Sequence, residues 1–410
     1  NDWAGVVITG AGSDGNVVAG NFIGTDRTGT FAIRNSNDGV WVGDGAKLNR
    51  IGTDGNGTAD AAERNVIAGN SGRGITITGL GADRNLVAGN YIGVDATGNQ
   101  KLPNYMGVMI YRGPNSNLIG SNGDGFGDEA ERNVISGNTS SGVFIGPGKT
   151  DGNVVAGNYI GTTADGSGAL GNAQFGISIS GDGTGEPSAN YVGTNAAGQA
   201  SPATRNVISA NKSTGVFISQ SSRNVISGNY IGTDAQGRVP LGNSQYGLVV
   251  YGDSNVIGTD GNGQGDEAEG NVISANGASG VMILSQITGQ NVVAGNYIGT
   301  DASGSVGLGN LLDGILVSSG AHRIGTNADG TSDAAERNII SGNQRHGVYV
   351  NGTGTVIAGN YIGTDATGLN ALGNGATNPL NCGIRLFQGT SNTVGGSPSK
   401  ANLIAFNTGA

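Results

Sequence analysis

Short alternating runs of apolar and polar residues recur along the whole chain, separated by glycine, asparagine and aspartate. The clearest run is a tetrapeptide of glycine, an apolar residue, a variable residue and a second apolar residue, which occurs twelve times at steps of 32 to 39 residues. Its copies begin at Gly5, Gly39, Gly74, Gly107, Gly142, Gly176, Gly215, Gly247, Gly280, Gly314, Gly347 and Gly383. Alternation over so few residues predicts a short β-strand, with positions two and four facing a core and position three facing outward. A fixed period of this length predicts a solenoid.

Two further strand patterns lie between successive tetrapeptides, and their order alternates. In one kind of rung the tetrapeptide is followed by a segment close to Asn-Val-Val-Ala-Gly-Asn-Tyr-Ile-Gly-Thr-Asp, with copies starting at Asn16, Asn85, Asn153, Asn224, Asn291 and Thr355. In the other kind it is followed by Ile-Gly-Thr-Asp-Gly-Asn-Gly, an acidic loop and Asn-Val-Ile-Ser-Gly-Asn. Those last segments start at Asn65, Asn133, Asn206, Asn271 and Asn338. The larger repeat therefore contains two rungs.

These patterns predict an all-β chain folded as a right-handed parallel β-helix (β-solenoid), with about 12 rungs of ~34 residues and three short strands in each rung. Inward valine and isoleucine should fill a continuous core, and asparagine at each bend should pair with the asparagine one rung away. A second interpretation, with about 20 residues in each turn, gives a longer rod. We expect a single solenoid domain over residues 1–410, as a segment or subunit of a longer assembly, because neither end carries a polar capping element.

Three repeated segments also carry a family resemblance: Asn-Val-Ile-Ser-Gly-Asn, Gly-Val-Phe-Ile and Gly-Asn-Tyr-Ile-Gly-Thr-Asp. In these segments the sequence resembles the right-handed parallel β-helix repeat family of secreted bacterial surface proteins. The resemblance covers essentially the whole chain. The resemblance implies the fold and a secreted, extracellular or cell-surface location. It leaves the activity open, because the family contains pectate lyases, polygalacturonases, alginate epimerases, phage tail-spike modules and adhesins.

Composition removes several classes of partner. The net charge of −10 argues against nucleic acid and anionic membrane surfaces. The sequence contains no run of 18 apolar residues, so no membrane insertion is expected. Cys382 is the one cysteine, which excludes an internal disulfide framework and is typical of a small buried side chain.

An acidic loop of the pattern Asx-x-Asx-Gly-x-x-Asp-x-x-Glu is the first candidate for chemistry. Oxygen ligands at this spacing around a glycine turn are what Ca²⁺ prefers, so the loops predict four calcium sites. Their candidate ligands are Asp54, Asn56, Asp60 and Glu63; Asn122, Asp124, Asp128 and Glu131; Asp260, Asn262, Asp266 and Glu269; and Asn327, Asp329, Asp333 and Glu336. The alternative is a set of Asx turns in which each glutamate pairs with Arg64, Arg132 or Arg337 just after it.

The third position of the tetrapeptide is the second candidate. Nine of these twelve residues are large and apolar, although they should face outward. The predicted interaction stripe consists of Trp41, Met109, Phe144, Phe217, Met282, Leu316 and Tyr349, together with Val7, Thr76, Ser178, Val249 and Arg385 at the remaining positions. An exposed apolar stripe normally marks an interaction surface, and lateral self-association or a flat partner would fit it. The alternative is that a loop of the same chain covers the stripe.

A row of aromatic residues recurs every second rung and is the third candidate. It comprises Phe22, Tyr91, Tyr159, Tyr230, Tyr297 and Tyr361. Each precedes an inward isoleucine and should point outward, where it would form a glycan-binding platform. The competing interpretation is that each ring packs on its neighbouring loop.

Catalytic residues are not predicted anywhere in the chain. The two histidines, His322 and His346, lie in different rungs, and the Gly-His-Gly, paired-Asp and Asp-Pro-His-Glu runs of β-helix polysaccharide enzymes are absent. The leading hypothesis is a non-enzymatic extracellular structural or adhesive β-solenoid, filament-forming and calcium-stabilised, which self-associates head to tail or laterally or binds a surface. The alternatives are a polysaccharide-acting lyase, hydrolase or epimerase on the same fold, and a glycan-binding adhesin.

Overall fold

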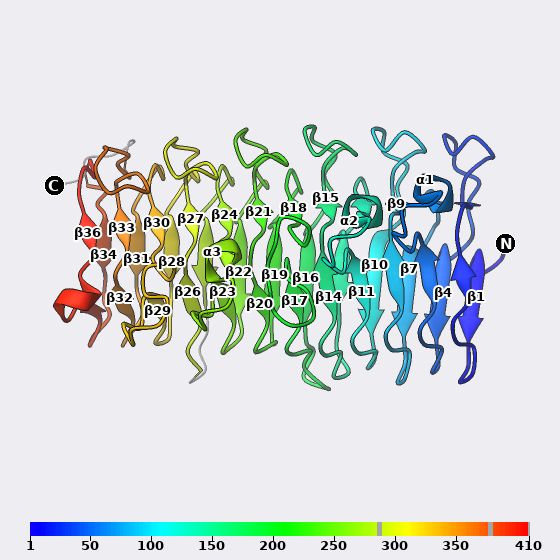
Figure 1. The fold of residues 1–410 in the computed structure, drawn as a ribbon, viewed down its shortest axis with the longest axis horizontal. Helices are drawn as coiled ribbons and strands as arrows, with labels where there is room; N and C mark the ends of the chain where they lie inside the picture. Colours follow the sequence, from blue (N-terminus) through cyan, green and yellow to red (C-terminus); the bar gives the residue numbers. More distant parts are fainter. Residues whose placement is uncertain (285–288, 376–379, 409–410) are drawn as a thin grey trace. The chain divides into compact units, whose positions relative to one another are not determined.

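The computed structural model describes residues 1–284, 289–375 and 380–408, which divide into two compact units. The first unit contains Asn1–Ser213 and Ser219–Ser221, and the second contains Thr214–Ile218 and the residues from Ser222 onward. Each unit is a parallel β-solenoid, and the chain has about 34 residues in each turn. Figure 1 shows the strands of each unit lying side by side, with almost no helix between them.

The first unit contains three parallel sheets of six strands each. The first sheet has the order β1 (Val6–Thr9), β4 (Val40–Gly43), β7 (Arg73–Thr78), β10 (Met106–Tyr111), β13 (Val143–Ile145) and β16 (Ile177–Ser180). The second has β2 (Val17–Val18), β5 (Arg50–Gly52), β8 (Leu86–Ala88), β11 (Leu118–Gly120), β14 (Val154–Ala156) and β17 (Tyr191–Val192). The third has β3 (Phe22–Ile23), β6 (Val66–Ile67), β9 (Tyr91–Ile92), β12 (Val134–Ile135), β15 (Tyr159–Ile160) and β18 (Val207–Ile208).

The second unit repeats this arrangement. Its first sheet has β19 (Val216–Ser219), β22 (Leu248–Tyr251), β25 (Val281–Ile283), β28 (Ile315–Val317), β31 (Val348–Val350) and β34 (Ile384–Leu386). Its second has β20 (Val225–Ile226), β23 (Val256–Gly258), β26 (Val292–Ala294), β29 (Arg323–Gly325), β32 (Val356–Ala358) and β35 (Thr393–Val394). Its third has β21 (Tyr230–Ile231), β24 (Val272–Ile273), β27 (Tyr297–Ile298), β30 (Ile339–Ile340), β33 (Tyr361–Ile362) and β36 (Leu403–Ile404).

The helices of the described residues are single turns. α1 (Asp60–Glu63), α2 (Asp128–Glu131) and α3 (Asp266–Glu269) each end an acidic loop, and the 3-10 helix η1 (Pro398–Lys400) lies near the end of the chain. The equivalent segment of the fourth acidic loop, residues 333–336, is a turn.

Strand register confirms the rung length predicted from the tetrapeptide. Val6 of β1 pairs with Val40 of β4, and Val40 pairs with Ile75 of β7, so successive rungs are 34 and 35 residues apart. The interpretation with about 20 residues in each turn was therefore wrong. Positions two and four of the tetrapeptide face inward, as predicted, since Val108, Ile110, Val143 and Ile145 are fully buried.

Asparagine ladders run along the bends of both units, as predicted. In the first unit each side-chain amide donates to the amide oxygen of the asparagine one rung on, at 2.8 to 3.3 Å. The three ladders begin at Asn16, Asn21 and Asn1. Because most of these amides are buried, the ladders satisfy polar groups that would otherwise destabilise the core.

Candidate functional site

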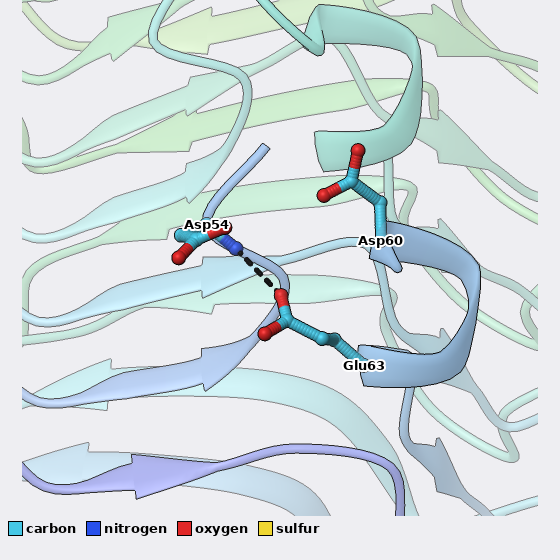
Figure 2. Close-up of side chains that lie close together, drawn as sticks. All are labelled: Asp54, Asp60 and Glu63. Atoms are coloured by element: carbon cyan, nitrogen blue, oxygen red, sulfur yellow. Dashed lines mark hydrogen bonds between the residues drawn. The ribbon is translucent and has the colours of Figure 1, made fainter. Parts of the chain in front are cut away.

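Each acidic loop connects a strand of the second sheet to a strand of the third sheet. In the first loop, between β5 and β6, the Thr53 hydroxyl donates to Asp60 Oδ1 at 2.9 Å, and the Gly57 N–H donates to Asp60 Oδ2 at 3.1 Å. Glu63 Oε2 accepts the backbone N–H of Asp54 at 3.1 Å, so the end of the loop is fastened to its start (Figure 2). These bonds hold the carboxylates of Asp60 and Glu63 close to Asp54 within one tight turn.

The structure brings together three of the four predicted ligands in two of the loops. Carboxylate oxygens of Asp54, Asp60 and Glu63 lie within 4.8 Å of one another, as do those of Asp260, Asp266 and Glu269. The fourth predicted ligand forms an Asx turn instead, because the Asn56 and Asn262 amide oxygens accept the N–H groups two residues on, at 2.7 Å. In the other two loops, Asp124 and Asp329 form the same turn at 2.8 Å.

Two arginines outside the predicted ligand sets form ion pairs with carboxylates of the first and fourth loops. Arg50 Nη1 lies 2.8 Å from Glu63 Oε2 and 3.5 Å from Asp54 Oδ2. Arg323 Nη1 lies 2.7 Å from Glu336 Oε1. In the second and third loops the equivalent residues are Leu118 and Val256, so these loops lack this cation.

The expected pairing of each glutamate with the arginine that follows it was wrong. Arg64, Arg132 and Arg337 instead place their guanidinium groups over tyrosine rings of the next rung, at 4.3, 4.4 and 4.1 Å from the ring centroids. The arginine that forms an ion pair with Glu63 or Glu336 lies on the strand before the acidic loop, and not next to the glutamate in the sequence.

The pKa values of Glu63, Glu131 and Glu269 differ according to whether that arginine is present. Burial opposes ionisation of Glu63, but hydrogen bonds from Arg50 and from the Asp54 backbone bring its pKa below 4.5. Burial raises the pKa of Glu131 to about 6 and that of Glu269 to about 7, and the nearby carboxylates of Asp260 and Asp266 add to the rise at Glu269.

Asp266 also differs from its counterparts in the other loops. Asp60, Asp128 and Asp333 each accept a hydroxyl hydrogen bond at Oδ1, from Thr53, Ser121 and Thr326. Asp266 is 5% exposed, yet its Oδ1 is buried without a hydrogen-bond partner. The third loop therefore has the least compensated carboxylates of the four.

The outward residues of the first sheet stack in register, but neighbouring side chains cover much of their surface. Trp41 and Phe144 are half-buried, and Thr76, Ser178 and Val249 are buried. Trp3 lies 5.5 Å from Trp41, and Tyr251 lies 5.7 Å from Phe217 between ring centroids. The remaining members of the predicted stripe are also half-buried: Met109, Phe217, Met282, Leu316 and Tyr349. The seven residues of the predicted stripe are thus partly exposed, and their role as an interaction surface stays a prediction.

A groove opens on this face within the first unit. Its volume is about 550 Å³. Its lining residues are Met109, Tyr111, Arg112, Phe144, Pro147, Gly148, Ser180, Gly181, Asp182 and Thr184. The Arg112 guanidinium lies 5.0 Å from the centroid of the Tyr111 ring. Two residues of the predicted stripe, Met109 and Phe144, thus contribute to a hollow with a mixed apolar and polar lining.

The aromatic row on the third sheet alternates with buried aliphatic residues. Tyr91 pairs in register with Val66 and Val134, and both valines are buried. The loop glycine Gly98 packs against the Tyr91 ring, and the Arg64 guanidinium lies over that ring. This arrangement favours the interpretation that each ring packs on its neighbouring loop, and it leaves Tyr91, Tyr159 and Tyr361 little free ring surface for a glycan.

The histidines and the cysteine occupy positions within the coil. His322 Nδ1 accepts the N–H of Asn291, in the place of a ladder asparagine, and its Nε2 lies 2.9 Å from the Ser319 carbonyl oxygen. His346 Nδ1 accepts the N–H of Cys382 at 3.1 Å. Burial lowers the pKa of both histidines, that of His346 to about 4 with the help of nearby arginines. Both side chains are fully buried.

Comparison with known proteins gives only distant structural similarities. No protein-family model matches the chain, and no curated protein matches it in sequence. The crystal structure of the periplasmic alginate epimerase AlgG has a TM-score of 0.38 and 11% identity, over 86% of this chain and 76% of that chain. A double mutant of AlgG has a TM-score of 0.37 and 12% identity, over 87% and 69%. The A-module of the Azotobacter vinelandii mannuronan C-5 epimerase AlgE6 has a TM-score of 0.34 and 13% identity, over 94% and 83%.

Among the helices of the described residues, none has the length and apolar character that a membrane span requires.

Proposed function

We propose that this chain is a non-enzymatic, extracellular adhesive β-solenoid that binds an extended carbohydrate polymer on the outer face of its first sheet. The observation that carries the proposal is the groove of about 550 Å³ over Met109 and Phe144 in the first unit. It is continuous with the in-register stack of outward residues on that sheet.

The lining of the groove suits a sugar chain. The Phe144 and Tyr111 rings and the Met109 thioether offer apolar surface to the C–H faces of sugar rings. Arg112, Asp182 and Thr184 offer donors and acceptors to hydroxyl groups at the edge of the same hollow. A mixed lining of this kind favours a partner with an apolar face and many hydroxyls over a purely apolar one.

The titratable groups of the groove favour binding over turnover. Among its lining residues Asp182 is the one carboxylate, and hydrogen bonds from Thr184 hold its pKa below the usual value. Glycoside hydrolysis usually requires a pair of carboxylates, one of them with a raised pKa. The carboxyls with raised pKa values lie elsewhere: Glu131 and Glu269 belong to the acidic loops, and Asp313 lies in the second unit.

Calcium is proposed as a stabilising ion of the loops that lack an arginine. Asp260, Asp266 and Glu269 would hold it in the third loop, where a buried carboxylate oxygen of Asp266 has no partner. Asn122, Asp128 and Glu131 are the corresponding residues of the second loop. In the first and fourth loops Arg50 and Arg323 already neutralise the glutamate. Self-association stays a prediction.

Binding to immobilised polysaccharides tests the proposal. We expect the double variant Met109→Ser/Phe144→Ser to lose roughly tenfold or more in affinity for any polymer that the protein retains. The matched control is Met282→Ser/Leu316→Ser, which changes the same tetrapeptide position in the second unit and should leave affinity unchanged.

Analysis of the incubated polymer separates adhesion from catalysis. An unchanged polymer supports the proposal. Shortened, unsaturated or epimerised chains would instead favour the alternative of a polysaccharide-acting enzyme. Equal retention of the groove variant and the protein itself would show that the groove is not the binding surface.

A further inference from the structure

The aromatic row contains an arginine site that the fold builds repeatedly. In three rungs a guanidinium group lies 4.1 to 4.4 Å from the centroid of a tyrosine ring. In each case Nε of the same arginine donates to a glycine carbonyl oxygen two residues before that tyrosine, at 3.1 to 3.2 Å. The three sets are Arg64 with Gly89 and Tyr91, Arg132 with Gly157 and Tyr159, and Arg337 with Gly359 and Tyr361.

At Tyr297 in the second unit this arginine is missing, because the residue at its place is Gly270. Gly270 has φ −61° and ψ 130°, close to the −57° and 128° of Arg64, so its backbone conformation does not require glycine. A Cβ at Gly270 would, however, collide with the Gly295 carbonyl oxygen. The Gly295 carbonyl group therefore occupies the space that the Cβ of an arginine at position 270 would need.

A pocket lies beside the Tyr297 ring. It has a volume of about 440 Å³, and its lining includes the Tyr297 ring, Gly295 and the two acids Asp266 and Glu267 of α3. The Gly304 backbone packs near one edge of the ring, as the loop glycines do at the other tyrosines. Among the described residues no guanidinium lies over Tyr297; that of Arg337, which also lines the pocket, lies over Tyr361.

The charge of the pocket matches the missing cation. Asp266 lies nine-tenths buried with its Oδ1 unpartnered, whereas the equivalent Asp60 accepts the Thr53 hydroxyl. Glu267 adds an exposed carboxylate where the first loop has Ala61. The pocket thus has one carboxylate more than its counterpart and one arginine fewer.

We propose that the Tyr297 pocket binds the guanidinium group of an arginine side chain from another polypeptide. The group stacks on the Tyr297 ring in the position that Arg64 occupies over Tyr91, and it donates to the exposed carboxylate of Glu267, which the proposed calcium site of Asp260, Asp266 and Glu269 does not use. This site is independent of the carbohydrate groove, which lies in the first unit.

A guanidinium group fits this pocket better than other cations. It is planar, so it stacks on an aromatic face while its N–H groups point to acceptors at the rim. An ammonium group lacks the plane and the fork of donors. Calcium prefers oxygen ligands and gains nothing from the ring face.

The test uses the protein with the peptide Ac-Gly-Arg-Gly-amide and its lysine equivalent as probes, in EDTA and again with Ca²⁺. We expect saturable binding of the arginine peptide by titration calorimetry or ligand-observed NMR, at least roughly threefold tighter than the lysine peptide. Free methylguanidinium should compete with it, which shows that the side-chain group rather than the peptide backbone is recognised.

Matched variants locate the site. Tyr297→Ala and Glu267→Gln should each weaken arginine-peptide binding roughly threefold to tenfold, while Tyr91→Ala in the first unit, whose ring carries Arg64, should leave it unchanged. Glu267 is exposed, so its variant tests the site even if Tyr297→Ala fails to fold. Equal binding of both peptides, binding that requires Ca²⁺, unchanged binding in Glu267→Gln, or no saturable binding would each overturn the proposal.

Discussion

The first and third acidic loops share one sequence pattern, but their carboxylates are neutralised differently. In the first loop Arg50 pairs with Glu63 at 2.8 Å, and Arg64 lies over Tyr91. In the third loop Val256 and Gly270 stand at the corresponding positions, and α3 carries the additional acid Glu267. Two residues outside the ten-residue motif therefore separate a loop whose charges are paired within the chain from one whose charges are not.

The comparison teaches that repetition of a motif does not imply repetition of its role. In the first loop, Arg50 pairs with Glu63 and Arg64 lies over Tyr91, so arginines of the chain itself occupy both places where a cation would bind. The third keeps the same backbone turn, but its glutamate has a pKa of about 7 and its aspartate has a buried oxygen without a partner. A cation that binds to a loop in this state should stabilise it, because it compensates the buried carboxylates.

The largest effect is expected when an arginine-containing loop is converted to the third type. Arg323→Val leaves Glu336, which is fully buried, without its cation. We expect the free energy of opening of this loop, measured by hydrogen exchange, to fall by about 3 kcal/mol at pH 8.

The control for this change is Arg50→Val, whose partners are more exposed, so its loss should be smaller. A loss of the same size in Arg323→Val and Arg50→Val would show that packing, and not the burial of an unpaired charge, accounts for the effect.

A pH titration in EDTA should give opposite signs at the two loops. The pKa of Glu269 rises from 4.5 in the unfolded chain to about 7 in the folded one, so the folded state binds the proton more tightly. The stability of the third loop should therefore fall by about 3 kcal/mol as the pH rises from 4.5 through 7. The pKa of Glu63 is lowered, so its contribution is present above pH 4.5 and is lost as the pH falls through the folded-state pKa.

The measurement is local hydrogen exchange corrected for its intrinsic pH dependence, with Glu269→Gln as the control. This variant cannot ionise at position 269, so the fall between pH 4.5 and 7 should disappear from its third loop. Persistence of the fall in Glu269→Gln would assign it to another group.

Much of the fold followed from the sequence because the solenoid repeats its local rules. The alternation of Gly39-Val-Trp-Val predicted an inward Val40 and Val42 and an outward Trp41, and the register of β4 with β7 agrees. The asparagines at the bends predicted the ladders, since a buried amide needs partners and the asparagine one rung away supplies one of them.

The site was less predictable, because its contacts join residues that are distant in the sequence. Arg50 and Glu63 meet across a loop, and the pattern Arg-Ile-Gly in place of Leu-Ile-Gly was the available signal. Gly270 was likewise visible as the exception to the arginine that precedes Asn65, Asn133, Asn206 and Asn338. Which group an arginine would contact depends on packing between rungs, which periodicity does not specify.

Calcium should distinguish the two loops by a smaller amount. At a Ca²⁺ concentration about 100 times its Kd, binding stabilises the loop that binds it by about 2.7 kcal/mol. We expect this stabilisation in the third loop and none in the first, where Arg50 stands beside Glu63 and Asp54. Hydrogen exchange with and without EDTA measures both loops in one sample.

The matched variant for calcium is Val256→Arg, which places a cation beside Glu269. It should remove the calcium effect from the third loop and bring the pKa of Glu269 down. Equal calcium protection of the first and third loops would contradict the assignment of the arginine as the discriminating residue.

The smallest effect is expected from Arg64→Gly, which gives the first loop the residue that the third has at Gly270. Loss of the contact with Tyr91 and of the bond to the Gly89 carbonyl should cost about 1 kcal/mol of local stability. The exposed Tyr91 ring should then gain binding of the arginine peptide, measured in a Tyr297→Ala background that lacks the original site. Because Ala61 replaces Glu267 there, the new site should bind more weakly than the Tyr297 pocket. Stability loss without any gain of binding would show that the acids of α3, rather than the vacant ring, determine recognition.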